Sequence, residues 1–147
     1  MENCNEIQKT VHDGSLNNPE RRLAISPVTI QTARAFVAWT HRYLAPPAEA
    51  EFVIGVQSGR GALVGVVFVD QSHDDRTAEI TCLSTDGTPN ACSALHGAAW
   101  RASRSRGYQR LIACTLADEP GTSFSAAGYQ RVTSYGLWQI TARRGCA

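Results

Sequence analysis

Three β-rich runs, a long helical pattern and one further apolar run follow one another along this chain, and this succession constrains the fold more than any other feature. The runs Glu51 to Gln57 and Ala62 to Val69 are joined by Ser-Gly-Arg-Gly, and the two glycines suit a tight hairpin. Thr77 to Leu83 resumes the β pattern after a polar turn. We therefore expect an antiparallel meander of three strands.

The helical pattern lies directly after this meander. Its small and apolar residues recur at helical spacing, at Ala91, Leu95, Ala98 and Ala102. Thr88 is expected to cap this helix, Pro89 to be its first residue and Gly107 to end it. The apolar run Leu111 to Leu116 comes next, and a strand that follows a crossover helix can lie parallel to the strand before it. The pattern predicts a βαβ unit.

Shorter segments flank this centre on both sides. Leu23 to Pro27 predicts a strand, and Thr29 is expected to cap the helix that follows, up to Leu44. Farther on, Glu119 to Ala127 predicts a short helix and Gln130 to Thr141 a terminal hairpin. The whole order is β-α-β-β-β-α-β-α-β-β. This order predicts an α/β (α+β) fold with a mixed sheet, in which an antiparallel meander passes into a βαβ unit.

Composition limits the domain count and the class of partner. With 147 residues, of which 43% are hydrophobic, the chain can bury one core, so we expect a polar tail (residues 1–22) and a single domain (residues 23–147). A net charge of +1 provides no global field that would gather nucleic acid or an anionic membrane. The longest apolar run, Gly61 to Val69, is too short to cross a bilayer, and the first residues lack the order of a secretory signal. We expect a soluble cytoplasmic protein, and five cysteines without C-x-x-C spacing predict reduced thiols and no metal site.

The amino end of the helix after the meander is the first candidate binding site. The backbone N–H groups of a helix's first turn lack intrahelical acceptors, and the helix dipole favours anions there. Asn90 to Ala94 are mostly small residues, which lets a pyrophosphate approach closely. The alternative is a well-capped, alanine-rich helix that only packs on the sheet.

Several of these segments resemble the GCN5-related N-acetyltransferase (GNAT) superfamily. The order of elements, the segment Gly107-Tyr-Gln-Arg-Leu-Ile-Ala-Cys-Thr-Leu and the segment Ser123-Phe-Ser-Ala-Ala-Gly-Tyr carry the resemblance, which covers residues 23–141. More narrowly, Thr85 to Ser93 together with Leu116 to Tyr129 is similar to a small bacterial and phage branch, itself distantly similar to the phage Mom DNA-modification protein. The resemblance implies a GNAT-like fold. It also implies transfer of an acyl group from acyl-CoA, in the first place acetyl-CoA, to an amine of a small molecule or a protein.

The resemblance implies roles for individual residues as well. Glu79, on the strand that leads to the phosphate-binding turn, is the candidate general base, and His41 and Ser123 are further catalytic candidates. The candidates for donor binding are Leu83, Thr85, Asn90, Ala91, Cys92, Ser93, Ala94 and Thr122. The alternatives are a solvent-facing strand charge for Glu79 and contact with terminal helix carbonyls for His41. For Thr122 or Ser123 the alternative is a helix cap.

Two departures from the family pattern leave the donor and the reaction open. The phosphate loop Q/R-x-x-G-x-G/A falls near Gly87 to Cys92, yet its G-x-G positions are Asn90-Ala91-Cys92 here. The tyrosine with which many family members protonate the leaving thiolate aligns with Phe124, which has no proton to give. The alternatives are therefore a Mom-like enzyme that modifies a nucleobase, an acyltransferase that uses aminoacyl-tRNA, and a binding module without catalysis.

The remaining polar residues indicate no site. His96 is expected on the surface of the long helix, and Cys82 and Cys114 are expected to be ordinary buried strand residues. Basic residues gather near the carbonyl end of that helix, where a solvated face is expected: Arg101, Arg104, Arg106 and Arg110. Because this end is opposite to the expected donor site, nucleic acid is a disfavoured partner.

Overall fold

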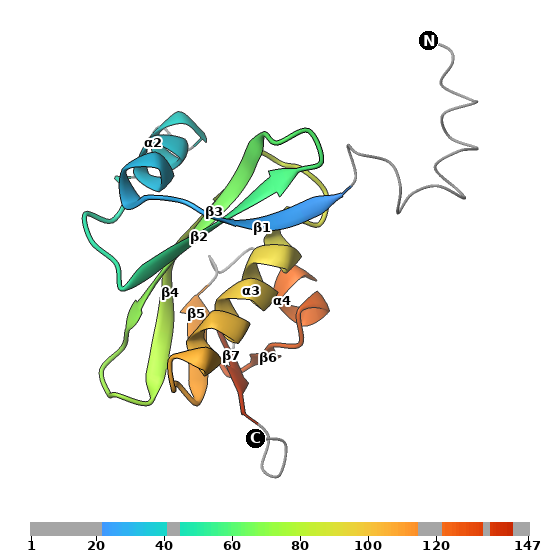
Figure 1. The fold of residues 1–147 in the computed structure, drawn as a ribbon. Helices are drawn as coiled ribbons and strands as arrows, with labels where there is room; N and C mark the ends of the chain where they lie inside the picture. The colour runs from blue at the N-terminus through green and yellow to red at the C-terminus, as the bar shows by residue number, and fades with distance from the viewer. Residues whose placement is uncertain (1–21, 41–44, 115–121, 134–135, 143–147) are drawn as a thin grey trace, which may run out of the picture.

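The structure, a computed structural model, describes residues 22–40, 45–114, 122–133 and 136–142. These residues form one seven-stranded sheet and three helices (Figure 1). The elements in chain order are β1 (Leu23–Pro27), α2 (Ile30–Thr40), β2 (Phe52–Ser58), β3 (Leu63–Gln71), β4 (Thr77–Thr85), α3 (Ala91–Ser105), β5 (Arg110–Cys114), α4 (Thr122–Ala126), β6 (Gln130–Arg131) and β7 (Leu137–Thr141). The predicted order of elements is confirmed, and β1 has the predicted bounds.

The strands lie in the order β1-β2-β3-β4-β5-β7-β6. Every neighbouring pair is antiparallel except β4 and β5, which are parallel because α3 carries the chain back between them. Strands β2, β3 and β4 are the predicted meander, and β4, α3 and β5 are the predicted βαβ unit. The mixed α/β fold class is therefore confirmed.

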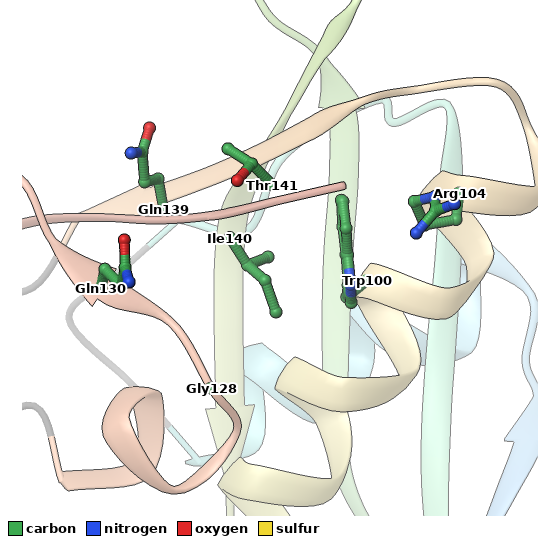
Figure 2. A pocket seen from close by; sticks show the side chains of 7 residues that line it. All are labelled: Trp100, Arg104, Gly128, Gln130, Gln139, Ile140 and Thr141. Atoms are coloured by element: carbon green, nitrogen blue, oxygen red, sulfur yellow. The ribbon is translucent and has the colours of Figure 1, made fainter. Parts of the chain in front are cut away.

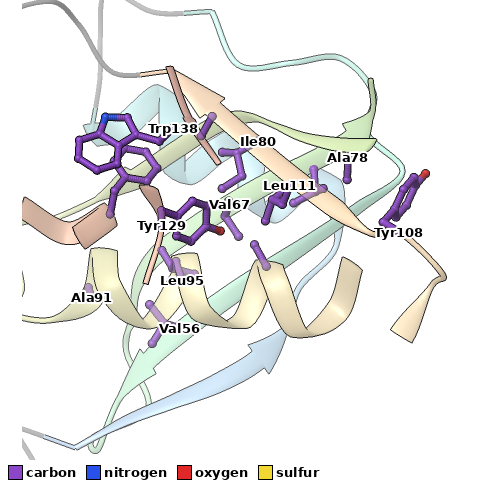
Figure 3. Packing of buried hydrophobic residues seen from close by; sticks show 14 of the residues in the cluster. Val56, Val67, Ala78, Ile80, Ala91, Leu95, Tyr108, Leu111, Tyr129 and Trp138 are labelled. Carbon is purple, nitrogen blue, oxygen red and sulfur yellow. The ribbon is translucent and has the colours of Figure 1, made fainter. Parts of the chain in front are cut away.

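Helices lie on both faces of the sheet (Figure 1). Phe36 and Val37 of α2 pack against Phe68 of β3 on one face. On the other face Leu95 of α3 packs with Val67 of β3, as Figure 3 shows. Strand β3 is therefore buried on both sides, which explains its nearly continuous apolar sequence, Leu-Val-Gly-Val-Val-Phe-Val.

A β-bulge interrupts β4 where it pairs with β3. Phe68 pairs with Cys82 and Val69 pairs with Ile80, so Thr81 has no counterpart. The extra residue reverses the alternation of side chains along β4. Ile80 packs on the α3 face, and Cys82, two residues later, packs on the α2 face.

The helix starts follow local hydrogen bonds. Thr29 caps α2 as predicted, because the Thr32 N–H donates to its Oγ1 at 3.1 Å. The predicted start of α3 is wrong: the helix begins at Ala91, and neither Thr88 nor Pro89 belongs to it. Thr88 instead donates its N–H and its hydroxyl to Asp86 Oδ1, at 3.0 and 2.6 Å, and this Asx turn delays the helix.

Two predictions of burial are also wrong. His96 is buried, with 3% of its surface exposed, because it shares a helical face with the buried residues Ala99 and Ser103. Cys114 is exposed, because the alternation along β5 directs Leu111 and Ala113 to the α3 core and Cys114 to the other face. Residues 1–21 of the predicted tail (residues 1–22), the first part of the predicted Glu119 to Ala127 helix, and the segment 41–44 lie outside the described residues. None of the helices within the described ranges has the length and apolar content that crossing a bilayer requires.

Candidate active site

Strands β4 and β5 stop pairing on the carboxyl side of Glu79 and Ile112, and we call the interval between them beyond that point the β4–β5 gap. The two strands pair over only three positions, of which Glu79 and Ile112 are the last. Beyond them β4 continues to Thr85 with β3 on one side, and β5 pairs only with β7 as far as Cys114. Parallel strands of open sheets bind ligands outside such carboxyl ends. The gap is the predicted splay at the join of meander and βαβ unit.

The amino end of α3 stands at the open side of this gap, immediately after β4. Asn90 precedes the helix with φ of 70°, a left-handed conformation that asparagine tolerates better than most non-glycine residues. Its side chain makes no capping hydrogen bond. The N–H groups of Cys92 and Ser93 have no hydrogen-bond acceptor among the residues that the structure describes. Two N–H donors at the positive helix end therefore lack a described acceptor, which suits an anion.

The turn from β4 into α3 brings most of the predicted donor-binding residues together. Thr85 Oγ1 accepts the N–H of Gly87 at 3.2 Å and lies 3.9 Å from the Cys92 sulfur. The end of β4 is thereby tied to the first turn of α3, where Asn90 to Ala94 follow one another. Leu83 lies two residues before Thr85 and packs partly against the α3-side core. No acidic residue lies in the first turn of α3 to repel an anion.

Glu79 lies at the closed end of the gap, away from the helix end. Thr85 is the sixth residue after it, which corresponds to roughly 20 Å along β4. The Glu79 side chain is half-buried. It faces the same side of the sheet as the side chain of Asp70, the residue of β3 with which it pairs. The structure therefore does not bring the predicted base to the phosphate-binding turn; it stands at the other end of the same gap.

The other predicted catalytic side chains, and that of the donor-binding candidate Thr122, are not described. His41 and the side chains of Thr122 and Ser123 lie outside the described part of the chain, although the backbone of α4 begins at Thr122. Their roles stay predictions. Among the described residues, no three His, Cys, Asp or Glu side chains lie close enough together to hold a metal ion.

An aromatic cluster between α3, α4 and β7 was missed by sequence reasoning. Phe124 stacks on Trp138 with ring centroids 5.4 Å apart, and the His96 ring lies 4.0 Å from Phe124. The Tyr129 hydroxyl donates to the His96 carbonyl oxygen at 2.9 Å. Burial lowers the pKa of His96 to about 4, and its Nδ1 has no hydrogen-bond partner among the described residues. The i, i+3, i+7 spacing of His96, Ala99 and Ser103 was the signal that could have revealed this burial.

Phe124 occupies the place at which the resemblance implies a tyrosine acid. Its ring is 6% exposed and is enclosed by the rings of His96, Tyr129 and Trp138. A phenyl ring supplies packing here and no proton. The replacement of the family's tyrosine by phenylalanine therefore lies at a well-packed core position beside α3.

Comparisons with known proteins bear on the fold. No protein-family model matches the sequence, and no curated protein matches it. Among solved structures, the GNAT domain of PAT from S. lividans is 18% identical, with a TM-score of 0.61 over 82% of this chain and 90% of that chain. The putative acetyltransferase yncA from Salmonella typhimurium, solved with acetyl-CoA, is 11% identical, with a TM-score of 0.63 over 85% and 96%. Spermidine N-acetyltransferase from Vibrio cholerae, in complex with CoA and spermine, is 11% identical, with a TM-score of 0.60 over 84% and 96%. At these identities the likeness shows a shared fold.

Proposed function

We propose that this chain, which has the fold of the GNAT acetyltransferases, transfers an acyl group from acyl-CoA to an amine. One observation carries the proposal: the N–H groups of Cys92 and Ser93, which have no acceptor in the described part of the chain, stand at the open end of the β4–β5 gap. A helix end in this setting suits the pyrophosphate of coenzyme A. Asn90 supports the assignment. The phosphate loop of the family has a glycine at this position, and Asn90 has the left-handed backbone conformation that glycine adopts most readily.

Coenzyme A supplies an acyl group as a reactive thioester at the end of a long flexible arm. From the helix end, β4 offers an edge that has no strand partner among the described residues, and the amide groups of the arm can pair with it. Such an arm would run from Thr85 toward Glu79. A donor with a long arm requires its phosphate site and its reactive thioester to lie far apart, and the helix end and the candidate base are separated in this way.

The reaction needs an unprotonated amine, and Glu79 is the candidate that accepts its proton. The amine nitrogen bonds to the acyl carbon, and the carbon–sulfur bond breaks to release a thiolate. Phe124 has no proton for this thiolate, so water supplies it in this proposal. For the acceptor we propose an amine of a small molecule or a protein, and the spermine complex of the Vibrio cholerae enzyme supports the small-molecule case.

A second candidate is a Mom-like enzyme that acts on a nucleobase or takes its acyl group from aminoacyl-tRNA. Trp39, on α2, favours it, because 70% of its surface is exposed and an exposed aromatic ring can stack on a base. Phe124 favours it as well, because it stands where many family members have the tyrosine that protonates the leaving thiolate of coenzyme A. Nucleosides of unchanged mass after co-expression, together with no binding of tRNA, would count against this candidate.

The donor proposal is tested by thermal unfolding with acetyl-CoA, because a ligand that binds only the folded state raises the unfolding temperature. The variant Ser93→Asp places a negative charge at the proposed phosphate site, and an acidic residue in the first turn does not weaken the helix itself. Gln31→Asp, in the exposed first turn of α2, is the matched control.

We expect acetyl-CoA to stabilise the parent protein and Gln31→Asp equally, and to bind Ser93→Asp at least about tenfold more weakly. A parent protein that no acyl-CoA stabilises would refute the proposal. Equal binding by Ser93→Asp would remove the helix end as the site.

A further inference from the structure

A cavity of about 440 Å³ lies beside the carboxyl half of α3, as Figure 2 shows. Its lining comes from α3, from the turn after α4 and from the last two strands: Trp100, Arg104, Gly128, Gln130, Gln139, Ile140 and Thr141. Trp100 follows Ala91 by nine residues, which places it roughly 14 Å along the helix axis from the proposed donor site. The cavity is therefore a separate feature, and its use requires no acyl transfer.

Arg104 brings an uncompensated positive charge to this cavity. Its guanidinium lies over the Trp100 ring, 5.4 Å from the ring centroid. None of the lining residues is acidic, and within the described part of the chain no carboxylate forms an ion pair with Arg104. The guanidinium is thus held in place by the indole and has no anionic partner among the described residues.

The carbonyl groups at the end of α3 do not need Arg104 as a hydrogen-bond donor. The Arg106 N–H donates to Ala102 O at 3.2 Å, the Tyr108 N–H to Ser103 O at 3.0 Å, and the Gly107 N–H to Arg104 O at 3.0 Å. These backbone groups already satisfy the last carbonyls of the helix. The guanidinium is therefore available to a ligand.

The outer edge of β7 adds backbone groups to the same cavity. Strand β6 begins at Gln130, which pairs with Gln139, so β6 does not extend to a position opposite Thr141. The Ala142 N–H donates to Gln109 O on the β5 side. Neighbouring residues of a strand direct their N–H and C=O groups to opposite sides, so those of Thr141 point away from β5, to an edge that no described strand pairs with.

Apolar surfaces complete the site. The Trp100 ring and the Ile140 side chain line the cavity, and Figure 2 shows both on the side of β7 that faces α3. A volume of 440 Å³ falls within the usual range for small-molecule sites. The lining combines one cation, an outward strand edge, two apolar side chains and the polar side chains of Gln130 and Gln139, and Arg110 Nε–H donates to Gln139 Oε1 at 2.7 Å.

We propose that this cavity binds a small carboxylate with a planar apolar body. The carboxylate would take hydrogen bonds from Arg104 and from the Thr141 N–H, and the body would lie against Trp100 and Ile140. An ion-paired, bidentate contact to arginine favours the acid over a neutral compound of the same shape.

The test uses the full chain, labelled with nitrogen-15, and two probes of nearly equal shape: phenylacetate and its neutral analogue phenylacetamide. NMR signals of the Thr141 amide and the Trp100 indole N–H report binding. Arg104→Gln removes the charge, and Arg101→Gln, an exposed arginine of α3 outside the cavity, is the matched control. The spectra also report whether each variant is folded.

We expect saturable shifts of both signals with phenylacetate and binding about tenfold weaker for phenylacetamide. Arg104→Gln should weaken phenylacetate binding by about the same factor, and Arg101→Gln should leave it unchanged. Three results would each overturn the proposal: no shift at millimolar phenylacetate, equal binding of acid and amide, or unaltered binding by Arg104→Gln. Acetyl-CoA binding serves as a separate readout, because it tests only the donor site.

Discussion

At the scale of single residues, His96 has the clearest consequence for stability. Burial lowers the pKa of this imidazole to about 4, against an ordinary value of 6.5. Between these two pH values the unfolded chain binds a proton that the folded protein does not. Stability is therefore fully present above pH 6.5 and falls as the pH drops toward 4, with a loss of about 2 kcal/mol at pH 5.

His96→Phe tests this prediction, because phenylalanine keeps a ring among Phe124 and Tyr129 and removes the unpartnered Nδ1. Urea unfolding at pH 7 and pH 5 should show the acid loss reduced by about 2 kcal/mol in His96→Phe. His73→Gln, at an exposed histidine, should keep the parent's loss. An equal loss in His96→Phe would show that other groups cause it.

Glu79 is the residue on which the proposed chemistry depends. Glu79→Gln keeps the shape of the side chain and removes its basicity, so kcat/KM should fall at least about a hundredfold. Acetyl-CoA binding should stay unchanged, because Thr85 and the start of α3 lie at the other end of the gap. Asp70→Asn, the carboxylate opposite Glu79, is the matched control and should change kcat/KM only slightly. The reverse result would transfer the role of base to Asp70.

At the scale of elements, the turn into α3 depends on one left-handed residue. Asn90 has a φ of 70°, where most residues with a Cβ atom are strained and asparagine is tolerated better, since its short polar side chain can hydrogen-bond locally. Asn90→Ala should lower the free energy of unfolding by about 1 kcal/mol, whereas Asn90→Gly should be neutral within a few tenths. Urea unfolding measures both variants. If alanine were tolerated as well as glycine, this turn would not be under the strain that its backbone angle indicates.

The elements themselves were mostly predictable, and the exceptions have local causes. The Thr29 cap of α2 and the parallel pairing of β4 with β5 follow from hydroxyl and crossover patterns that the sequence displays. The start of α3 was predicted too early, because Asp86 competes for the hydrogen-bonding groups of Thr88. The sequence around Thr88 does not reveal which of the two interactions is stronger.

The side chains that face the gap were less predictable than the elements. Regular alternation along β4 would place Ile80 and Cys82 on one face, yet the bulge at Thr81 separates them. The bulge arises from the register with β3, which lies far away in sequence. Similarly, the burial of His96 depends on Phe124 and Tyr129, which arrive through the long-range packing of α4.

At the scale of the whole molecule, β3 joins the two helical layers. Val67 belongs to the core under α3, and Phe68, the next residue, belongs to the core under α2. The layers have a second link, because Thr40 of α2 and the buried Ser84 of β4 share a hydrogen bond of 2.6 Å. Neither core can lose its packing without disturbing the strand between them, so we expect the domain to unfold in one cooperative step.

Truncation of one fully buried side chain in each core tests this cooperativity. Leu95→Ala, on the α3 side, should cost about 3 kcal/mol, and Val37→Ala, on the α2 side, about 2 kcal/mol. Both changes should shift one and the same urea transition, measured by far-ultraviolet circular dichroism and by amide exchange in both helices. Two separate transitions, or faster exchange of α2 alone in Val37→Ala, would show that the α2 layer unfolds independently. Because α2 lies on the sheet face that carries Glu79, that outcome would also mean that the face of the candidate base can open while the α3 side stays folded.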